Sequence, residues 1–317
     1  MYMAKIYLKL VGMAFFWGGT YVAGRILGGG LSVGGDLLCP KITPFSGAFW
    51  RFVTALLVLG PYLILTEKRP RLDAKTILVI LGIGATGIAI YNFLFLWGLQ
   101  RVPAGRTAVI IASNPVFVAL AAHFLFKERL GTVRILGILV CLAGASLAIG
   151  HGNPLALFSG QLSRHDLGIV AAMLCWAAYS ILGKFAVGKI SPLAAVTLAC
   201  LAGVLMLLPF ALAEGLATET LRLTLTGWGA ILFLGIFGTA IGFVWFYEGL
   251  QAIGATRAAV FINITPVSAA LLGAVILGEP IDASLVAGGA LVLIGVALTN
   301  KRAGQTARAL PKAADMP

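Results

Sequence analysis

The stretch "RTAVIIASNPV" (residues 106–116) places a polar pair and a proline inside an apolar run long enough to cross a membrane. A second stretch, "RAAVFINITPV" (257–267), repeats the pattern, and its proline follows the first by 151 residues. Proline cannot donate a backbone hydrogen bond, so Pro115 and Pro266 each free the carbonyl four residues earlier. Such a carbonyl persists in hydrocarbon only where a side chain, water or solute satisfies it. The sequence therefore predicts two helix breaks with polar partners inside the membrane.

The composition is also typical of a membrane protein. Of 317 residues, 60% are hydrophobic and 11% charged, and the mean hydropathy is +1.01, whereas a soluble chain carries about 25% charged residues. About 20 apolar residues span a bilayer as one helix. The sequence contains ten such runs, at 6–24, 45–65, 76–99, 103–124, 132–150, 167–186, 193–213, 228–250, 255–277 and 283–300.

The net charge of +12 could indicate nucleic-acid binding, so the positions of the cations matter. If the N-terminus lies inside, the inner segments hold 16 of the 23 lysines and arginines, as the positive-inside rule requires. The basic clusters at 68–75 and 301–312 then set topology and contact lipid headgroups, and we expect no nucleic-acid partner. The first run is long and lacks a cleavage site, which favours a retained span over a signal peptide. We expect both termini in the cytoplasm.

The proline stretch belongs to a longer internal repeat. The following residues recur 151 positions later: Gly98, Gln100, Val109, Glu128, Gly137 and Gly144. Two copies of five spans explain this offset, and because five is odd the second copy must be inverted in the membrane. We predict an all-α polytopic membrane protein of ten transmembrane helices, built as two inverted five-helix repeats around a central cavity. The repeats are 1–150 and 151–300, followed by a cytoplasmic basic tail at 301–317.

Polar residues beside the breaks and aromatic residues in other spans predict a substrate cavity near the middle of the membrane. Pro115 and Pro266 are the expected hinges. The predicted substrate-binding residues are Trp17, Thr20, Tyr21, Tyr91, Asn92, Ser113, Asn114, Trp176, Tyr179, Ser180, Thr239, Phe243, Asn263 and Thr265. In the alternative interpretation, the prolines only kink their helices for packing, Asn114 and Asn263 bond between helices, and each aromatic residue is a packing residue.

Charged and reactive residues inside the spans are scarce. No Asp or Glu falls at mid-span, so we predict no proton relay and expect movement down the solute's own gradient. Arg51 and Lys184 are expected to snorkel towards the interface, although either is an open candidate for holding a carboxylate. The sequence has no nucleophile elbow, phosphate loop or metal-binding cluster, and its four cysteines show no CxxC spacing. We therefore expect no enzyme activity, no cofactor and no metal.

Three stretches carry a family resemblance: "AFWRFVTALLVL" (48–59), "GLQRVPAGRTAVIIASNPVFVALAAHFLFKERL" (98–130) and "GLQAIGATRAAVFINITPVSAALLGAVILGEPI" (249–281). They resemble the EamA family of the drug/metabolite transporter superfamily. The resemblance implies a ten-helix secondary transporter of a bacterial inner membrane, with a central cavity, and many relatives export amino acids and other metabolites. The family residues that carry over are Arg51, Pro115, Glu128, Pro266 and Glu279.

Two departures qualify the resemblance. The second copy has Ala199 where Arg51 would fall, which argues against a paired role for that arginine. The small multidrug members of the superfamily couple protons through a glutamate in the first span, and this chain has none there. The aromatic interior is most similar to YddG-type exporters of aromatic amino acids.

The expected function is an exporter or facilitator of amino acids with aromatic or bulky apolar side chains. Its partners would be a small-molecule substrate and the lipid bilayer, and the sequence leaves the oligomeric state open, with a monomer compatible. Multidrug efflux is the alternative within transport. A lipid-modifying membrane enzyme or a scaffold is the remote alternative.

Overall fold

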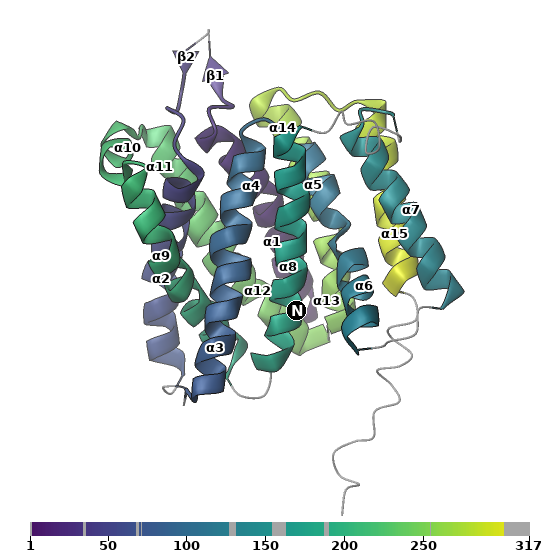
Figure 1. Ribbon diagram of the computed structural model, residues 1–317, viewed down its shortest axis with the longest axis horizontal. Coiled ribbons are helices and arrows are strands. Elements are labelled where there is room, and N and C mark those ends of the chain that lie inside the picture. The colour runs from purple at the N-terminus through teal and green to yellow at the C-terminus, as the bar shows by residue number, and fades with distance from the viewer. Residues whose placement is uncertain are drawn as a thin grey trace, which may run out of the picture.

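The computed structural model describes residues 2–33, 36–67, 70, 72–126, 131–153, 163–186, 190–253 and 255–300. These residues form a bundle of roughly aligned helices with a small hairpin projecting from one end (Figure 1). The hairpin pairs strand β1 (Ser32–Val33) with β2 (Asp36–Leu37). We refer to this end of the bundle as the hairpin end. Glu128 and the predicted basic tail lie outside the described residues, as do the side chains of Lys184 and Arg257.

The described residues up to 150 form seven α-helices and one π-helix besides the hairpin. They are α1 (Tyr2–Leu27), α2 (Pro44–Thr66), α3 (Ala74–Ile83), the π-helix η1 (Gly84–Ile90), α4 (Tyr91–Leu99), α5 (Ala104–Ala112), α6 (Asn114–Phe126) and α7 (Thr132–Ile149). The helices α3, η1 and α4 are continuous.

The second part follows the same order with one short additional helix. Its helices are α8 (Arg164–Ala186), α9 (Pro192–Ala213), α10 (Leu216–Arg222), α11 (Leu225–Leu232), the π-helix η2 (Phe233–Ile241), α12 (Gly242–Ile253), α13 (Ala255–Ile262), α14 (Thr265–Leu277) and α15 (Ala283–Asn300). Again one π-helix lies inside a continuous helix, here between α11 and α12.

Within the part of the chain that the structure describes, eight helical stretches are long and apolar enough to cross a membrane: Met3–Leu27, Pro44–Thr66, Ala74–Leu99, Thr132–Ile149, Arg164–Gly183, Pro192–Ala213, Leu225–Ile253 and Val260–Leu277. Two shorter apolar stretches, Ala104–Leu120 and Ala283–Thr299, fall on the fourth and tenth predicted spans. The prediction of a helical, multi-pass membrane protein is therefore confirmed. Ten membrane crossings in two inverted repeats stay a prediction.

Capping residues explain where α2 and α9 begin. The Thr43 hydroxyl accepts a hydrogen bond from the backbone N–H of Ser46, and the Ser191 hydroxyl accepts one from Ala194. A proline occupies the first position of each helix, where its missing N–H costs nothing. Ser191 also donates a hydrogen bond to Glu67 at the end of α2. The two helices therefore run antiparallel, with like starts at opposite ends of the bundle.

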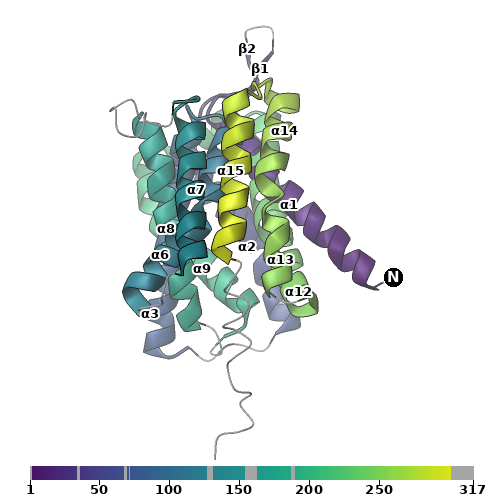
Figure 2. The ribbon, with the colours of Figure 1, turned by 90° about the vertical axis from the view of Figure 1, so that its right-hand side faces the viewer.

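Helices α7 and α15 pack together at unusually short range. A Cβ atom added to Gly144 would lie 2.7 Å from the carbonyl oxygen of Gly288, and one added to Gly288 would lie 2.7 Å from the carbonyl oxygen of Gly144. No larger residue fits at either position without moving a backbone, which is the packing that small residues permit between membrane helices. Figure 2 shows the two helices side by side on the face towards the viewer, which is the right-hand edge of the bundle in Figure 1.

The candidate site lies within the largest hydrophobic core cluster. This cluster includes Tyr21, Phe52, Phe95 and Leu207, which come from α1, α2, α4 and α9. Large apolar side chains such as Leu57 and Val275 are 71% and 83% exposed on the outer surface. An apolar outer surface around a packed interior suits a bundle surrounded by lipid.

Candidate substrate site

Two π-helices form the frame of the site. A π-helix is rare, and it commonly marks a functional position inside a longer helix. Gly84 and Gly87 lie in η1, and Gly235 and Gly238 lie 151 residues later in η2. This is the same offset that separates the two prolines. The backbone therefore widens at matching positions in the two parts of the chain.

Arg51 of α2 joins the two π-helical stretches. Its Nε donates to the Thr239 hydroxyl of η2 over 3.1 Å, and its Nη1 donates to Asn92 Oδ1 over 2.9 Å. The Thr239 hydroxyl donates in turn to the carbonyl of Leu234 over 2.9 Å. Arg51 is only 8% exposed. The expectation that it snorkels towards the interface is wrong, because its head group points into the bundle and is held there by neutral polar partners.

Asn92 and Thr239 satisfy carbonyls that the π-helices leave open. The Asn92 amide donates to the carbonyls of Gly87 and Ile88 over 3.0 and 2.9 Å. Asn92 and Thr239 are both predicted site residues. Both are buried, Asn92 at 2% exposure and Thr239 at 0%. The structure thus brings two of the predicted uncharged polar residues together, through an arginine that was not among the predicted site residues.

Close contacts at glycine residues set how near the neighbouring helix lies to each π-helix. A Cβ on Gly235 would lie 2.5 Å from the Arg51 carbonyl oxygen, and one on Gly84 would lie 3.0 Å from that of Ala199. Ala199 is the residue that the sequence aligns with Arg51. Its side chain offers no donor, so Arg51 has no counterpart in the second part of the chain.

The aromatic residues predicted for the cavity form a row beside Arg51. The rings of Tyr91 and Trp176 have centroids 5.0 Å apart, and those of Trp176 and Tyr179 are also 5.0 Å apart. Tyr91 stacks on Phe95 at 5.8 Å, and Tyr21 meets Phe95 edge-on at 5.2 Å. Tyr21 and Tyr91 are buried, while Trp176 and Tyr179 are half-buried. Helices α1, α4 and α8 therefore supply one continuous aromatic surface.

A second aromatic group contains Trp17 and Phe243. Their ring centroids are 5.5 Å apart, and Trp17 also contacts Phe246 at 5.4 Å. Thr20 lies between the groups on α1 and donates to the carbonyl of Trp17 over 2.6 Å. Ser180 is used in the same way, donating to the carbonyl of Trp176 over 2.8 Å. The hydroxyls of Thr20 and Ser180 therefore bond to backbone carbonyls of their own helices.

The first proline break connects to α8. Helix α5 ends at Ala112 and α6 begins at Asn114, so the helix is interrupted directly before Pro115. The Asn114 amide donates to the carbonyl of Met173 over 2.9 Å, and the Ser113 hydroxyl donates to the carbonyl of Ile110 over 2.6 Å. Asn114 thus makes the bond between helices that the packing interpretation expects.

The second proline break differs in its polar contacts. Helix α13 ends at Ile262 and α14 begins at Thr265, with the half-buried Asn263 between them. The Thr265 hydroxyl is buried without a hydrogen-bond partner among the described residues. Ser268, three residues later, donates to the carbonyl of Ala14 in α1 over 3.0 Å. Both predicted interruptions are therefore present, and each lies against a helix from the other part of the chain.

The charged residues of the hairpin end form a separate polar layer. Arg25 Nε lies 3.2 Å from Glu279 Oε1, and Glu279 Oε2 accepts from the backbone N–H of Ala104 over 2.8 Å. Arg106 lies 3.0 Å from Asp282 and donates to the carbonyl of Ala148 over 2.6 Å. These bonds join α1 and α5 to the segment between α14 and α15, and they also join α5 to α7.

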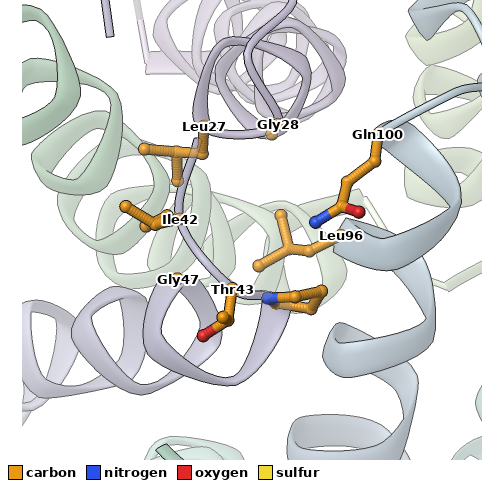
Figure 3. A pocket seen from close by; sticks show the side chains of 9 residues that line it. Leu27, Gly28, Ile42, Thr43, Gly47, Leu96 and Gln100 are labelled. Carbon is orange, nitrogen blue, oxygen red and sulfur yellow. The ribbon is translucent and has the colours of Figure 1, made fainter. Parts of the chain in front are cut away.

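Two clefts lie at the same end. One is open to solvent and includes Arg106, His151, Glu279 and Asp282 in its lining. The other is a smaller cleft between α1, α2 and α4. Figure 3 shows Leu27, Ile42 and Leu96 converging on it, with Gln100 at its rim. Neither cleft is lined by the predicted substrate-binding residues.

A comparison with known protein families shows to which family the chain belongs. The model of the EamA-like transporter family matches it twice, at residues 4–150 and 164–301. The chain belongs to the EamA-like transporter family. It is thus a membrane transport protein, and this agrees with its apolar helices and with the resemblance seen in the sequence.

Two bacterial proteins named as transporters are similar to this EamA-family protein over nearly their whole length. The uncharacterized transporter YyaM of Bacillus subtilis is 30% identical over 294 residues, covering 92% of both chains. A probable terminal-alkyne amino-acid exporter of Streptantibioticus cattleyicolor is 29% identical over 305 residues, covering 95% of both. One solved crystal structure of a protein shares the fold with a TM-score of 0.63 at 19% identity, covering 96% of this chain and 99% of the other.

Proposed function

We propose that this EamA-family protein exports amino acids, or lets them cross the membrane, by alternating access between two inverted five-helix repeats. The observation that carries the proposal is the bridge from Arg51 to Asn92 beside η1 and to Thr239 in η2. One side chain of the first part thereby holds the widened helices of both parts. A solute that binds at this point contacts both, which is what a rocking transporter requires of its substrate site.

Matching contacts in the two parts support the inverted repeat. Gly235 in η2 packs on the Arg51 carbonyl of α2, while Gly84 in η1 approaches the Ala199 carbonyl of α9. Helices α2 and α9 are antiparallel, so equivalent contacts occur in opposite directions. The family model also matches the chain once in each part. We therefore propose the repeats at 1–150 and 151–300, with hinges at Pro115 and Pro266.

The aromatic surface supports a substrate with a bulky apolar side chain. Tyr91, Trp176 and Tyr179 present a row of rings beside a buried cation. Offset or edge-on contacts with aromatic rings stabilise an aromatic ligand by about 0.5–1.5 kcal/mol each beyond burial. The similar Streptantibioticus protein is named as a probable amino-acid exporter. Phenylalanine, tyrosine, tryptophan and methionine are the substrates we propose first, as in YddG-type exporters.

Transport is proposed to follow the solute's own gradient, in an inner membrane with both termini in the cytoplasm. The ion pairs among the described residues involve carboxylates near helix ends, at Glu248, Glu279 and Asp282. A carboxylate that binds and releases protons at the substrate site would be the usual coupling device. In the proposed site the charged residue is Arg51 instead.

Proteoliposomes loaded with radiolabelled amino acids test the proposal. We expect efflux of phenylalanine and tryptophan well above that of empty liposomes, and the same rate with or without a proton gradient. Efflux equal to leak for all five of phenylalanine, tryptophan, tyrosine, methionine and threonine would refute it. Faster efflux with a proton gradient would refute only the uncoupled mechanism.

Multidrug efflux is the second candidate, and the aromatic row favours it because flat aromatic drugs stack on such surfaces. Most drugs of this class are cations, and Arg51 repels them. Resistance to a panel of cationic dyes without tolerance to amino acids would move the assignment to drug efflux.

A further inference from the structure

We propose that Arg51 is the carboxylate-binding residue of the substrate site, so that the protein selects substrates by an anionic head group and accepts them by an aromatic tail. This inference rests on the proposed amino-acid transport and names the group of the substrate that the site recognises. It also makes a prediction of its own, because carboxylates that are not amino acids should bind.

The first argument is charge. The guanidinium stays protonated in proteins, and Arg51 is 8% exposed. The ion pairs among the described residues use Glu248, Glu279 and Asp282, and none involves Arg51. Buried charges are ordinarily paired, because an uncompensated one is costly. Arg51 therefore carries a positive charge that its described neighbours do not neutralise.

The second argument is the unused hydrogen-bonding capacity. Guanidinium has five N–H donors in a planar fork that fits a carboxylate with two parallel bonds. The bonds from Arg51 to described residues use Nε, towards Thr239, and Nη1, towards Asn92. Nη2 makes no bond to a described residue and can donate to a carboxylate oxygen. Thr239 and Asn92 thus hold Nε and Nη1 in place, and the two N–H groups of Nη2 remain for a ligand.

The third argument is what surrounds the guanidinium. Asn92, which bonds to Arg51, directly follows Tyr91 in α4, and the Tyr91 ring continues into the row with Trp176 and Tyr179. A carboxylate on Arg51 would place the side chain of an aromatic amino acid over these rings. Its ammonium group would meet ring faces, which attract cations. The site therefore has a defined partner for each part of the molecule.

A ligand series tests the head-group requirement on the wild-type protein. We would purify the full chain in nanodiscs and measure equilibrium binding of L-phenylalanine, 3-phenylpropanoate, phenylalaninamide and phenethylamine. The first two have a carboxylate and the last two do not. We expect the carboxylates to bind about ten- to a hundredfold more tightly, because a hydrogen bond to a charged group is worth about that ratio. Equal binding of phenylalanine and phenylalaninamide would overturn the inference.

Substitutions then identify the residue. Arg51→Gln should lower the affinity for 3-phenylpropanoate by about tenfold or more, and Arg51→Lys should lower it less, since lysine keeps the charge but not the fork. Arg101→Gln is the matched control, because Arg101 is exposed at the hairpin end and its loss should leave binding unchanged. Wild-type affinity in Arg51→Gln would overturn the inference. If that variant fails to fold, Arg51→Lys and the wild-type ligand series still decide.

The outcomes also separate the two proposals. If 3-phenylpropanoate binds through Arg51 but no amino acid is transported, the carboxylate site stands and amino-acid transport falls. If amino acids are transported and Arg51→Gln transports them at the wild-type rate and affinity, amino-acid transport stands and the carboxylate site falls.

Discussion

Asn92 holds Arg51 with one end of its amide and the first π-helix with the other. Oδ1 accepts from Arg51 Nη1 over 2.9 Å, while Nδ2 donates to the carbonyl of Ile88 over 2.9 Å. The amide is uncharged, so it orients the guanidinium without neutralising it. Replacing the amide with a carboxylate would change the charge of the site with little change in shape.

Asn92→Asp should therefore weaken binding of carboxylate ligands by supplying an internal carboxylate. We expect the affinity for phenylalanine to fall by about tenfold or more, measured by equilibrium binding in nanodiscs. Asn92→Ala is the comparison, because it removes the amide but adds no negative charge, and it should weaken binding less than Asn92→Asp does. Equal losses in the two variants would show that orientation of Arg51, and not its free charge, is what binding needs.

Gly235→Ala should destabilise the bundle. Its new Cβ would lie 1.9 Å from the Thr54 hydroxyl oxygen and 2.5 Å from the Arg51 carbonyl oxygen, so η2 and α2 must separate. Overpacking of this kind costs about 1–3 kcal/mol, which a thermal melt of the purified protein would show as a lower Tm. Gly229→Ala in α11 is the control, since nothing lies within 4 Å of its added Cβ. It should be neutral or slightly stabilising.

The two ends of the bundle should respond differently to the loss of an ion pair. Side-chain exposure is 22% for Arg25 and 13% for Glu279, but 37% for Lys9 and 38% for Glu248. Glu279→Ala also removes the acceptor for the N–H of Ala104, so we expect a cost of about 1–3 kcal/mol. Glu248→Ala should cost about 0–1 kcal/mol. Equal shifts in Tm would contradict this difference in burial.

Asp282 should contribute stability throughout the neutral range. Hydrogen bonds from the Ser284 hydroxyl and the Leu285 N–H, together with the charge of Arg106, hold the pKa of Asp282 below its ordinary value. A carboxyl with a lowered pKa stabilises the folded state above its unfolded pKa, about 3.9, and loses this contribution as the pH falls through the folded value. The Tm difference between the wild type and Asp282→Asn should stay constant from about pH 5 to 8. It should shrink below about pH 4, and a difference that changes between pH 6 and 8 would assign the effect to another group.

Trp176→Ala and Asn114→Ala should separate the substrate surface from the packing bond. Trp176 lies in the middle of the aromatic row, so its loss should weaken transport in the liposome assay with little change in folded yield. Asn114 bonds to the Met173 carbonyl, so its loss should lower Tm, at a cost of about 0.5–1.5 kcal/mol. Unchanged transport in both variants would make both residues packing residues only.

Periodicity, composition and the repeated proline predicted most of the fold. Apolar runs gave the helical membrane protein because a bilayer admits few other spanning structures, and Pro115 and Pro266 marked both interruptions because proline removes a backbone bond. The pairing of β1 with β2 and the two π-helices carry no comparable pattern. Their glycines, such as Gly84 and Gly235, were visible as a pair with the same offset, but the widening depends on side chains such as Asn92 and Thr239 that bond to the opened carbonyls.

The sequence predicted several residues of the site, but it did not predict Arg51, which lies at the centre of the network. Asn92, Thr239, Tyr91 and Trp176 all lie in or beside the network, because polar and aromatic residues deep in a span need partners. Arg51 was interpreted as an interfacial residue from its position near a helix end. A sequence cannot show that its partners come from α4 and η2, which are distant from Arg51 in the chain. The absence of an acid at mid-span was the available signal, since it left an arginine without a carboxylate to pair with.

The position of Arg51 also has an electrical consequence. A charge that moves across the whole membrane gains or loses about 2.3 kcal/mol per 100 mV, so a rocking motion that shifts Arg51 through part of the field makes each conformational step sensitive to voltage. A zwitterionic amino acid adds no net charge. The loaded protein would carry the charge of Arg51 through the field in one direction, and the empty protein would carry it back. The electrical work of the first step would therefore be recovered in the second. The membrane potential would set which side the resting protein faces, and it would leave the final concentration ratio of the substrate unchanged.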